Sequence, residues 1–184
     1  MSARVTPYKI AVVGGECTGK TVLCQALAES LPALWVPEYL REFVDRHARV
    51  PQRHDQALIL DTQIRLEAEA MVRAAAGGVA WLACDSAPIV TAIYSAMYFG
   101  DRSLDAIAQE HHTTYSFTLL TDTDLTWEPD GAQRDGPEVR AEFDARVDAW
   151  LTARGVPFAR VSGHGDERVE AALAALRVLQ SRPR

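Results

Sequence analysis

Lysine is almost missing from this sequence of 184 residues, which holds two lysines, Lys9 and Lys20, beside 17 arginines. Aspartate and glutamate outnumber the basic residues by 25 to 19, so the net charge is -6 at pH 7. Proteins that bind nucleic acid along its backbone usually carry the opposite balance. We therefore expect no nucleic-acid partner, and we expect any phosphate to be held at one local site.

Long apolar runs and metal-binding patterns are missing as well. No segment approaches the roughly 18 apolar residues of a membrane helix, and the N-terminus lacks the arrangement of a signal peptide. The three cysteines, Cys17, Cys24 and Cys84, have no metal-ligand spacing and are interpreted as reduced thiols. His111 and His112 have no third ligand in reach, so the pair is interpreted as a solvated edge. These absences predict a soluble cytoplasmic protein with no membrane partner.

Apolar, β-prone runs alternate with helical patterns along the whole chain. Strands are expected at 8–13, 34–37, 79–84, 115–120 and 156–161. Helices are expected at 20–30, 38–47, 52–76, 87–99, 103–110, 138–154 and 166–180. This alternation predicts an α/β fold, one domain over residues 1–184 with a five-stranded parallel sheet and helices on both faces.

The segment GGECTGKT at 14–21 fits the pattern G-x-x-x-x-G-K-[ST] and lies between an expected strand and an expected helix. Its glycines let backbone N–H groups turn toward phosphate oxygens, and the helix N-terminus adds positive charge. Lys20 is expected to neutralise the β- and γ-phosphates, and the Thr21 hydroxyl to bind Mg²⁺. The pattern predicts a P-loop NTPase that binds a nucleoside triphosphate, and it leaves the preference between ATP and GTP open. The expected nucleotide-binding residues are Gly14, Gly15, Glu16, Cys17, Thr18, Gly19, Lys20, Thr21 and Val22.

The fate of the γ-phosphate must be decided by the other segments, because kinases, GTPases and motors share this loop. A guanine-recognition motif needs a lysine after the loop, and none follows Lys20. Two further alternatives stay open. One is an ATPase switch or binding module, and the other is a nucleoside monophosphate kinase whose extra basic residues are Arg41 with Arg46 or Arg49.

Acidic residues end two of the expected strands, where ligands of parallel sheets gather. Glu38 follows the second strand, with Arg41 beside it, and Asp85 follows the third at the position of an acid that contacts Mg²⁺. Either carboxylate is a candidate to orient or deprotonate an acceptor hydroxyl. The helix after Asp85 carries Tyr94 and Tyr98, whose spacing fits either the core or a platform for a flat ring.

A polar stretch at about 121–137 is expected to form a lid, because loops of this length in compact domains usually serve a function. Arg134 and Arg140 are candidate clamps on the transferring phosphoryl group, and Trp127 is a candidate to stack on a flat ring. The candidate catalytic residues are thus Lys20, Glu38, Asp85, Arg134 and Arg140. Positive charge is expected to gather around Lys20, Arg41, Arg134 and Arg140.

Five segments resemble the ribosylnicotinamide kinase domain of NadR-type NAD-biosynthesis proteins and their stand-alone AAA-like ATPase relatives: GGECTGKT with the helix that follows it, WVPEYLRE, the helix from Gln56 to Glu69, CDSAPIVTAIYSAMYFG and YSFTLLTDTDLTWEPDGAQRDG. The resemblance covers nearly the whole chain. It implies ATP- and Mg²⁺-dependent phosphorylation of the ribose 5′-hydroxyl of nicotinamide riboside, a small-molecule substrate, to give nicotinamide mononucleotide. The candidate acceptor-binding residues are Glu38, Tyr39, Arg41, Asp85, Tyr98, Trp127 and Asp130.

Two features depart from that family. Its loop usually has serine where this chain has Cys17. The adenylyltransferase and DNA-binding modules of the bifunctional proteins have no counterpart here, so we expect a kinase alone. The sequence leaves a homo-oligomer open, and it supports a small-molecule kinase more strongly than it supports nicotinamide riboside as the acceptor.

Overall fold

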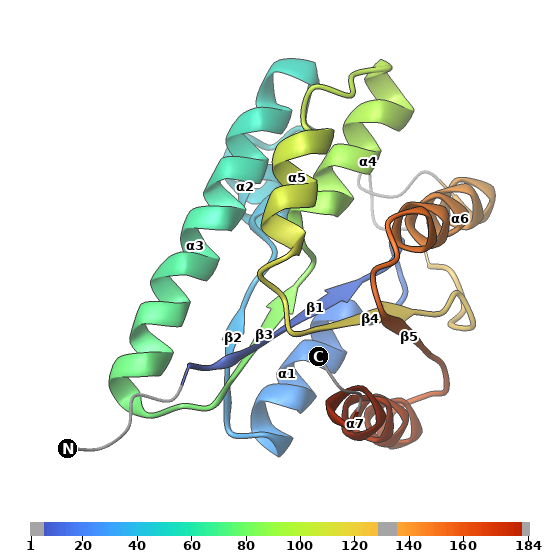
Figure 1. Cartoon of the computed structure of the whole chain (residues 1–184). Helices are drawn as coiled ribbons and strands as arrows, with labels where there is room; N and C mark the ends of the chain where they lie inside the picture. The colour runs from blue at the N-terminus through green and yellow to red at the C-terminus, as the bar shows by residue number, and fades with distance from the viewer. Residues whose placement is uncertain (1–5, 129–135, 182–184) are drawn as a thin grey trace.

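A computed structural model describes residues 6–128 and 136–181 of the chain (Figure 1). The strands are β1 (Tyr8–Val13), β2 (Ala33–Val36), β3 (Trp81–Asp85), β4 (Phe117–Thr121) and β5 (Phe158–Val161). The helices are α1 (Lys20–Ser30), α2 (Tyr39–His47), α3 (Gln56–Gly77), α4 (Pro88–Phe99), α5 (Asp105–His112), α6 (Pro137–Ala153) and α7 (Asp166–Gln180), with a short 3-10 turn at Arg53–Asp55. The expected α/β alternation is confirmed. No helix within the described ranges has both the length and the apolar character needed to cross a membrane.

All five strands are parallel and lie in the order β2-β3-β1-β4-β5. Side chains of a strand alternate between the two faces of a sheet, and both faces of β1 are buried. Ala11 and Val13 pack with residues of α3, α4, α5 and α6, whereas Ile10 and Val12 pack with residues of α1 and α7. Figure 1 shows the same division, with α1 and α7 on the side of the sheet opposite α3, α4 and α5.

The crossovers that leave β1 and β3 run to opposite faces of the sheet, although these two strands are neighbours. The chain passes from β1 into α1 on one face, and from β3 into α4 on the other. Such a reversal opens a crevice at the carboxyl ends of the two strands, where ligands of open α/β sheets bind. The fold therefore places the phosphate loop and the end of β3 on the two sides of one crevice.

A buried network of charges lies toward the opposite end of β1. The Lys9 Nζ atom is 2.6 Å from Glu67 Oε2, and a His111 ring nitrogen is 2.8 Å from the same oxygen. The Tyr115 hydroxyl donates to the Glu67 carboxylate at 2.8 Å. Burial by itself raises the pKa of Glu67, but the hydrogen bond with His111 and the charge of Lys9 outweigh burial and lower it. His112 is also buried, so the interpretation of the histidine pair as a solvated edge is wrong.

His112 gives the fold a predictable dependence on pH. Its ring accepts or donates one hydrogen bond with Thr118 Oγ1 at 3.0 Å, and burial, followed by the repulsion of His111, lowers its pKa from 6.5 to about 4. Between pH 6.5 and about 4, His112 therefore binds a proton in the unfolded chain but stays neutral in the folded chain. The contribution of His112 to the free energy of unfolding is therefore greatest above pH 6.5. It falls by about 3 kcal/mol as the pH decreases to 4.

We therefore expect the free energy of unfolding of His112→Gln to depend less steeply on pH than that of the wild type between pH 7 and 4. Denaturant unfolding across this range measures the slope. The matched control is His54→Gln, because the His54 side chain is 71% exposed. Equal slopes in the wild type and His112→Gln would contradict the assignment.

Candidate functional site

The phosphate loop is packed so closely that glycine is required at its start. Gly14 has φ +151, and a Cβ atom there would lie 2.2 Å from Thr121 Oγ1 at the end of β4. At Gly15, a Cβ atom would lie 3.1 Å from Arg140 Cγ of α6. The Thr18 hydroxyl donates to the Gly15 carbonyl at 2.8 Å, within the loop itself. The two glycines thus let β4 and α6 close against the loop.

Lys20 is the first residue of α1, and its side chain turns back over the loop. The residue is 8% exposed, and Nζ donates to the Gly15 carbonyl at 2.7 Å. A helix N-terminus already favours anions because its first N–H groups are unpaired within the helix. The Lys20 ammonium adds a full positive charge at the same place, as a phosphate cradle requires.

Asp85 and Glu38 form a pair of carboxylates in the crevice. Asp85 is 1% exposed, and neither of its oxygens has a hydrogen-bond partner among the described residues. Burial raises the pKa of Asp85, and the nearby charge of Glu38 raises it further, against opposing effects of Thr21, Lys20 and Arg41. Glu38 precedes α2, and its side chain is 11% exposed. A buried carboxylate with a raised pKa and unused acceptor atoms suits either a base or a cation ligand.

Thr21 and Asp85 also meet the requirements of a Mg²⁺ site that is completed by phosphate. Mg²⁺ in nucleotide sites takes one or two carboxylates and substrate phosphates rather than a full cage of protein ligands. In residues 6–128 and 136–181, no group of three histidines, cysteines or acids is arranged to hold a metal. The two unpartnered oxygens of Asp85 beside the Thr21 hydroxyl are therefore the donor set that fits the ion.

Two residues beside the crevice adopt strained backbone conformations. Cys17 of the phosphate loop has φ 52, and Ser86, which follows Asp85, has φ 73. Both angles fall in the left-handed region, which costs an L-residue roughly 1–3 kcal/mol. The Ser86 N–H donates to the Val12 carbonyl at 2.9 Å, so this conformation ties the end of β3 to β1. Strain of this kind is concentrated at functional sites.

A cavity of about 480 Å³ lies beside the phosphate loop, among α2, α3 and α4. This volume is in the range of small-molecule sites. Glu16 of the phosphate loop lines it, and so does Gln56 at the start of α3. Its other walls are mostly apolar and aromatic, and include Leu40, Val44, Ile59, Thr91, Tyr94 and Tyr98. Because Glu16 belongs to both features, a molecule in the cavity would lie next to a phosphate on the loop.

Aromatic rings join the cavity wall to the core. Tyr94 stacks on Phe143 of α6 with ring centroids 4.0 Å apart, and on Tyr98 at 5.7 Å. Tyr98 is 45% exposed and lies at the rim. Tyr94 therefore packs on the core, and its ring also lines the cavity, while the role of this helix as a platform for a flat ring stays a prediction.

The described beginning of the expected lid, residues 121–128, contacts the phosphate loop. The Trp127 Nε1 atom donates to Glu16 Oε1 at 2.9 Å, and the Gly136 N–H donates to the same oxygen at 3.3 Å. Arg140 is 9% exposed and donates to the Leu125 carbonyl at 2.9 Å. The lid segment, the phosphate loop and α6 are thus connected by two side chains, Glu16 and Arg140.

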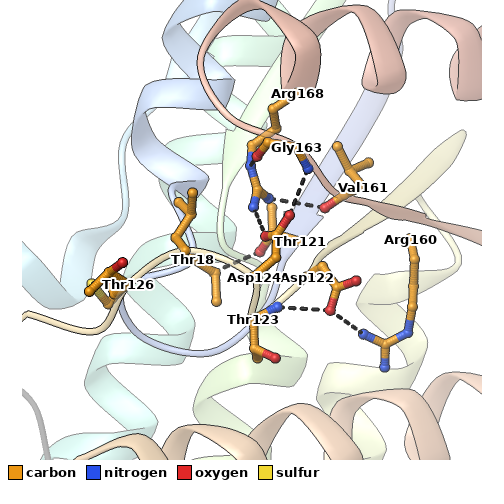
Figure 2. A network of polar contacts seen from close by, with 12 residues as sticks. Thr18, Thr121, Asp122, Thr123, Asp124, Thr126, Arg160, Val161, Gly163 and Arg168 are labelled. Carbon is orange, nitrogen blue, oxygen red and sulfur yellow. Dashed lines mark hydrogen bonds and ion pairs between the residues drawn. The ribbon is translucent and has the colours of Figure 1, made fainter.

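Ion pairs fix the base of this segment (Figure 2). Arg168 of α7 pairs with Asp124 and donates to the Gly163 carbonyl at 2.9 Å, while the Gly163 N–H donates to Asp124 Oδ2 at 2.6 Å. Arg160 of β5 lies 3.7 Å from Asp122. The two aspartates that follow β4 therefore hold the loop in place, and neither lines the cavity.

A family model described as an AAA domain matches residues 9–168, which is most of the chain. The chain belongs to this AAA domain family. The resemblance to NadR-type proteins and AAA-like relatives is thereby confirmed for the family and, through the structures below, for the fold.

Three solved structures share the fold of this AAA domain. The crystal structure of NadR protein in complex with NR has a TM-score of 0.78 at 20% identity and covers 97% of this chain and 53% of that chain. The crystal structure of NadR protein in complex with NAD and AMP-PNP has a TM-score of 0.73 at 19% identity, and the match covers 97% of this chain and 51% of that chain. The crystal structure of thymidylate kinase from Ehrlichia chaffeensis has a TM-score of 0.62 at 16% identity, and the match covers 95% of this chain and 99% of that chain. The chain thus spans about half the length of the NadR chains. No curated protein sequence matches it significantly.

The AAA domain brings together most of the residues that the sequence selected. Lys20 and Arg41 both act on the pKa of Asp85, and the Arg140 side chain lies against Gly15 of the phosphate loop. The Val22 side chain is 69% exposed on α1, away from the loop interior. The Tyr39 N–H donates to Gln63 at 2.9 Å. Arg134 and Asp130 lie outside the described residues.

Sequence reasoning missed two residues of the AAA domain. Glu16 was assigned only to the nucleotide, yet it also lines the cavity and holds Trp127. Gln56 was placed at the start of a helix that carries the resemblance and was given no role of its own, yet it is 7% exposed and lines the same cavity. The available signal was its place in the buried stripe of α3, which includes Gln63 and Glu67, because polar residues in a buried stripe need a partner.

Proposed function

We propose that this AAA domain is a kinase that uses ATP and Mg²⁺ to phosphorylate the ribose 5′-hydroxyl of a nucleoside, with nicotinamide riboside as its acceptor. The observation that carries the proposal is the cavity that opens directly beside the phosphate loop, with Glu16 in both. A hydrolytic switch needs no second cavity, whereas a kinase must hold an acceptor next to the γ-phosphate. The fold shared with NadR protein in complex with NR supports the choice of acceptor.

Each residue has a role in the proposed reaction. Loop N–H groups and Lys20 bind the β- and γ-phosphates of ATP, and Thr21 with Asp85 holds Mg²⁺, which neutralises phosphate charge when bound. Asp85 or Glu38 accepts the proton of the acceptor hydroxyl. The hydroxyl oxygen then bonds to the γ-phosphorus as the bond to the β–γ bridging oxygen breaks, and ADP leaves. Arg140, with Arg134, stabilises the charge of the transferring group.

The alternative of a monophosphate kinase is supported by the fold shared with thymidylate kinase. It requires basic side chains that are available for a second phosphate. Arg46 is paired with Glu42, and Arg49 is paired with Asp55 at 2.6 Å and donates to it through two nitrogens. Because both side chains are already neutralised by carboxylates, we favour a nucleoside as the acceptor.

An acceptor screen tests the proposal. Release of ADP from ATP is measured with nicotinamide riboside, a panel of nucleosides and their monophosphates, and the product mass is checked for one added phosphoryl group. We expect nicotinamide riboside to stimulate ADP release most strongly. Stimulation only by a monophosphate would establish the alternative. ADP release that no acceptor increases would overturn the kinase proposal in favour of a switch or binding module.

A further inference from the structure

Gln56 differs from the other buried polar residues of its helix stripe. Gln63 Oε1 accepts a hydrogen bond from the Tyr39 N–H at 2.9 Å, and Glu67 is held by the buried network around Lys9. Gln56 is 7% exposed and lines the cavity, and its side-chain amide makes no hydrogen bond with the described part of the chain. Because Gln56 lines the cavity, the donors and the acceptor of its amide are available to a molecule that binds there.

The surroundings of Gln56 restrict what that partner is. The neighbouring walls, from Ile59 on the same helix to Leu40 and Tyr94 on its neighbours, offer apolar surface and an aromatic ring. Such a wall accommodates a flat ring. A carboxamide side chain presents one acceptor and two donors, so its best match is a ring edge that carries an adjacent donor and acceptor. A carboxylate on the ring would present two acceptors and would oppose the Gln56 oxygen.

We propose that the Gln56 amide binds the donor–acceptor edge of the acceptor ring and selects an uncharged amide-like group against a carboxylate. This inference rests on the proposed function, because it assigns the ring of the acceptor to the cavity. It predicts that nicotinamide riboside is preferred to nicotinic acid riboside, which differs from it only in having a carboxylate in place of the ring amide. A site built to hydrogen-bond a substrate group discriminates strongly against analogues that leave its own groups unpaired.

The test compares kcat/KM for these two ribosides in the wild type and in variants. We expect the wild type to prefer the amide by about ten- to a hundredfold, in keeping with one or two hydrogen bonds. Gln56→Met keeps the length of the side chain and removes its polar atoms, and is expected to bring the preference close to one. Gln56→Glu keeps an acceptor and repels a carboxylate, and is expected to retain the preference. A merely structural role of Gln56 would not separate these two variants.

Gln52→Met is the matched control, because Gln52 lines the same cavity but is exposed. It should keep the preference that Gln56→Met loses. If nicotinamide riboside is not phosphorylated, the same comparison is made with the best nucleoside of the screen and its N-methylated analogue, which lacks the donor. A preference unchanged in Gln56→Met overturns the inference and leaves the kinase proposal intact, whereas no turnover of any nucleoside overturns the kinase proposal itself.

Discussion

An Asp85→Asn variant is expected to lose between about 10² and 10⁴ in kcat, the range that a positioned acid or base supplies. Asp85 ends β3 in the crevice, is 1% exposed, and has no hydrogen-bond partner in the described ranges for either oxygen. Asparagine has nearly the same size, but it neither accepts a proton at neutral pH nor offers two anionic oxygens to Mg²⁺. Turnover at saturating ATP and acceptor measures the loss.

Thermal unfolding separates this effect from a structural one. Burial raises the pKa of Asp85, so the folded state is penalised for keeping this carboxylate charged. Replacing the acid with a neutral amide removes that penalty, and we expect the Tm of Asp85→Asn to equal or exceed that of the wild type. A variant that is inactive and less stable would point instead to a role in holding the end of β3.

The companion variant Glu38→Gln decides which carboxylate is the base. The charge of Glu38 raises the pKa of Asp85. If Asp85 is the base, removing that charge lowers its pKa, and the acid limb of the kcat/KM profile moves to lower pH while most activity remains. If Glu38 is the base, Glu38→Gln suffers the large loss. A loss below about tenfold in both variants would contradict both assignments.

The fold was predictable because short-range sequence patterns indicate each helix and strand. The run YKIAVV and the helix after Lys20 lie within a few residues of where the sequence places them, since apolar alternation and glycine boundaries act over short distances. The phosphate loop was equally predictable, because its chemistry depends on eight consecutive residues. Asp85 followed from the same logic, because the end of a buried parallel strand leads to the ligand edge of the sheet.

The cavity was not predictable in the same way, because it depends on how three consecutive helices, α2, α3 and α4, pack beside Glu16 of the phosphate loop. Gln56 becomes conspicuous only when its neighbours on α2 and α4 are known. The interpretation of His111 and His112 as a solvated edge was wrong for the same reason. His111 is 44 residues from Glu67, its partner at 2.8 Å, and no local pattern carries that information. An interpretation that assumes a residue has no partner because none is near it in sequence is therefore easily wrong, since the partner can come from a distant segment.

Lys20→Met is expected to lower kcat/KM for ATP by about 10² to 10³, the effect of removing one donor that stabilises developing charge. Lys20 is 8% exposed and its ammonium nitrogen lies 2.7 Å from the Gly15 carbonyl oxygen, so the charge is already positioned over the loop. Methionine preserves the alkyl chain and removes only the charge. Steady-state kinetics and the Kd of a non-hydrolysable ATP analogue measure the two parts of the loss.

Lys20→Arg makes this prediction specific for the shape of the group as well as its charge. The planar guanidinium of arginine is larger than the ammonium of lysine, and it binds best to two acceptors side by side. The phosphate loop has room for one compact charge beside the phosphate oxygens, so we expect the guanidinium to fit poorly there. In a chain with 17 arginines and two lysines, we therefore expect Lys20→Arg to be nearly as impaired as Lys20→Met. The control is Lys9→Arg, since Lys9 binds Glu67 far from the loop and its replacement should leave the KM for ATP unchanged. Full activity of Lys20→Arg would mean that charge alone suffices at this position, and full activity of Lys20→Met would remove Lys20 from the phosphate site.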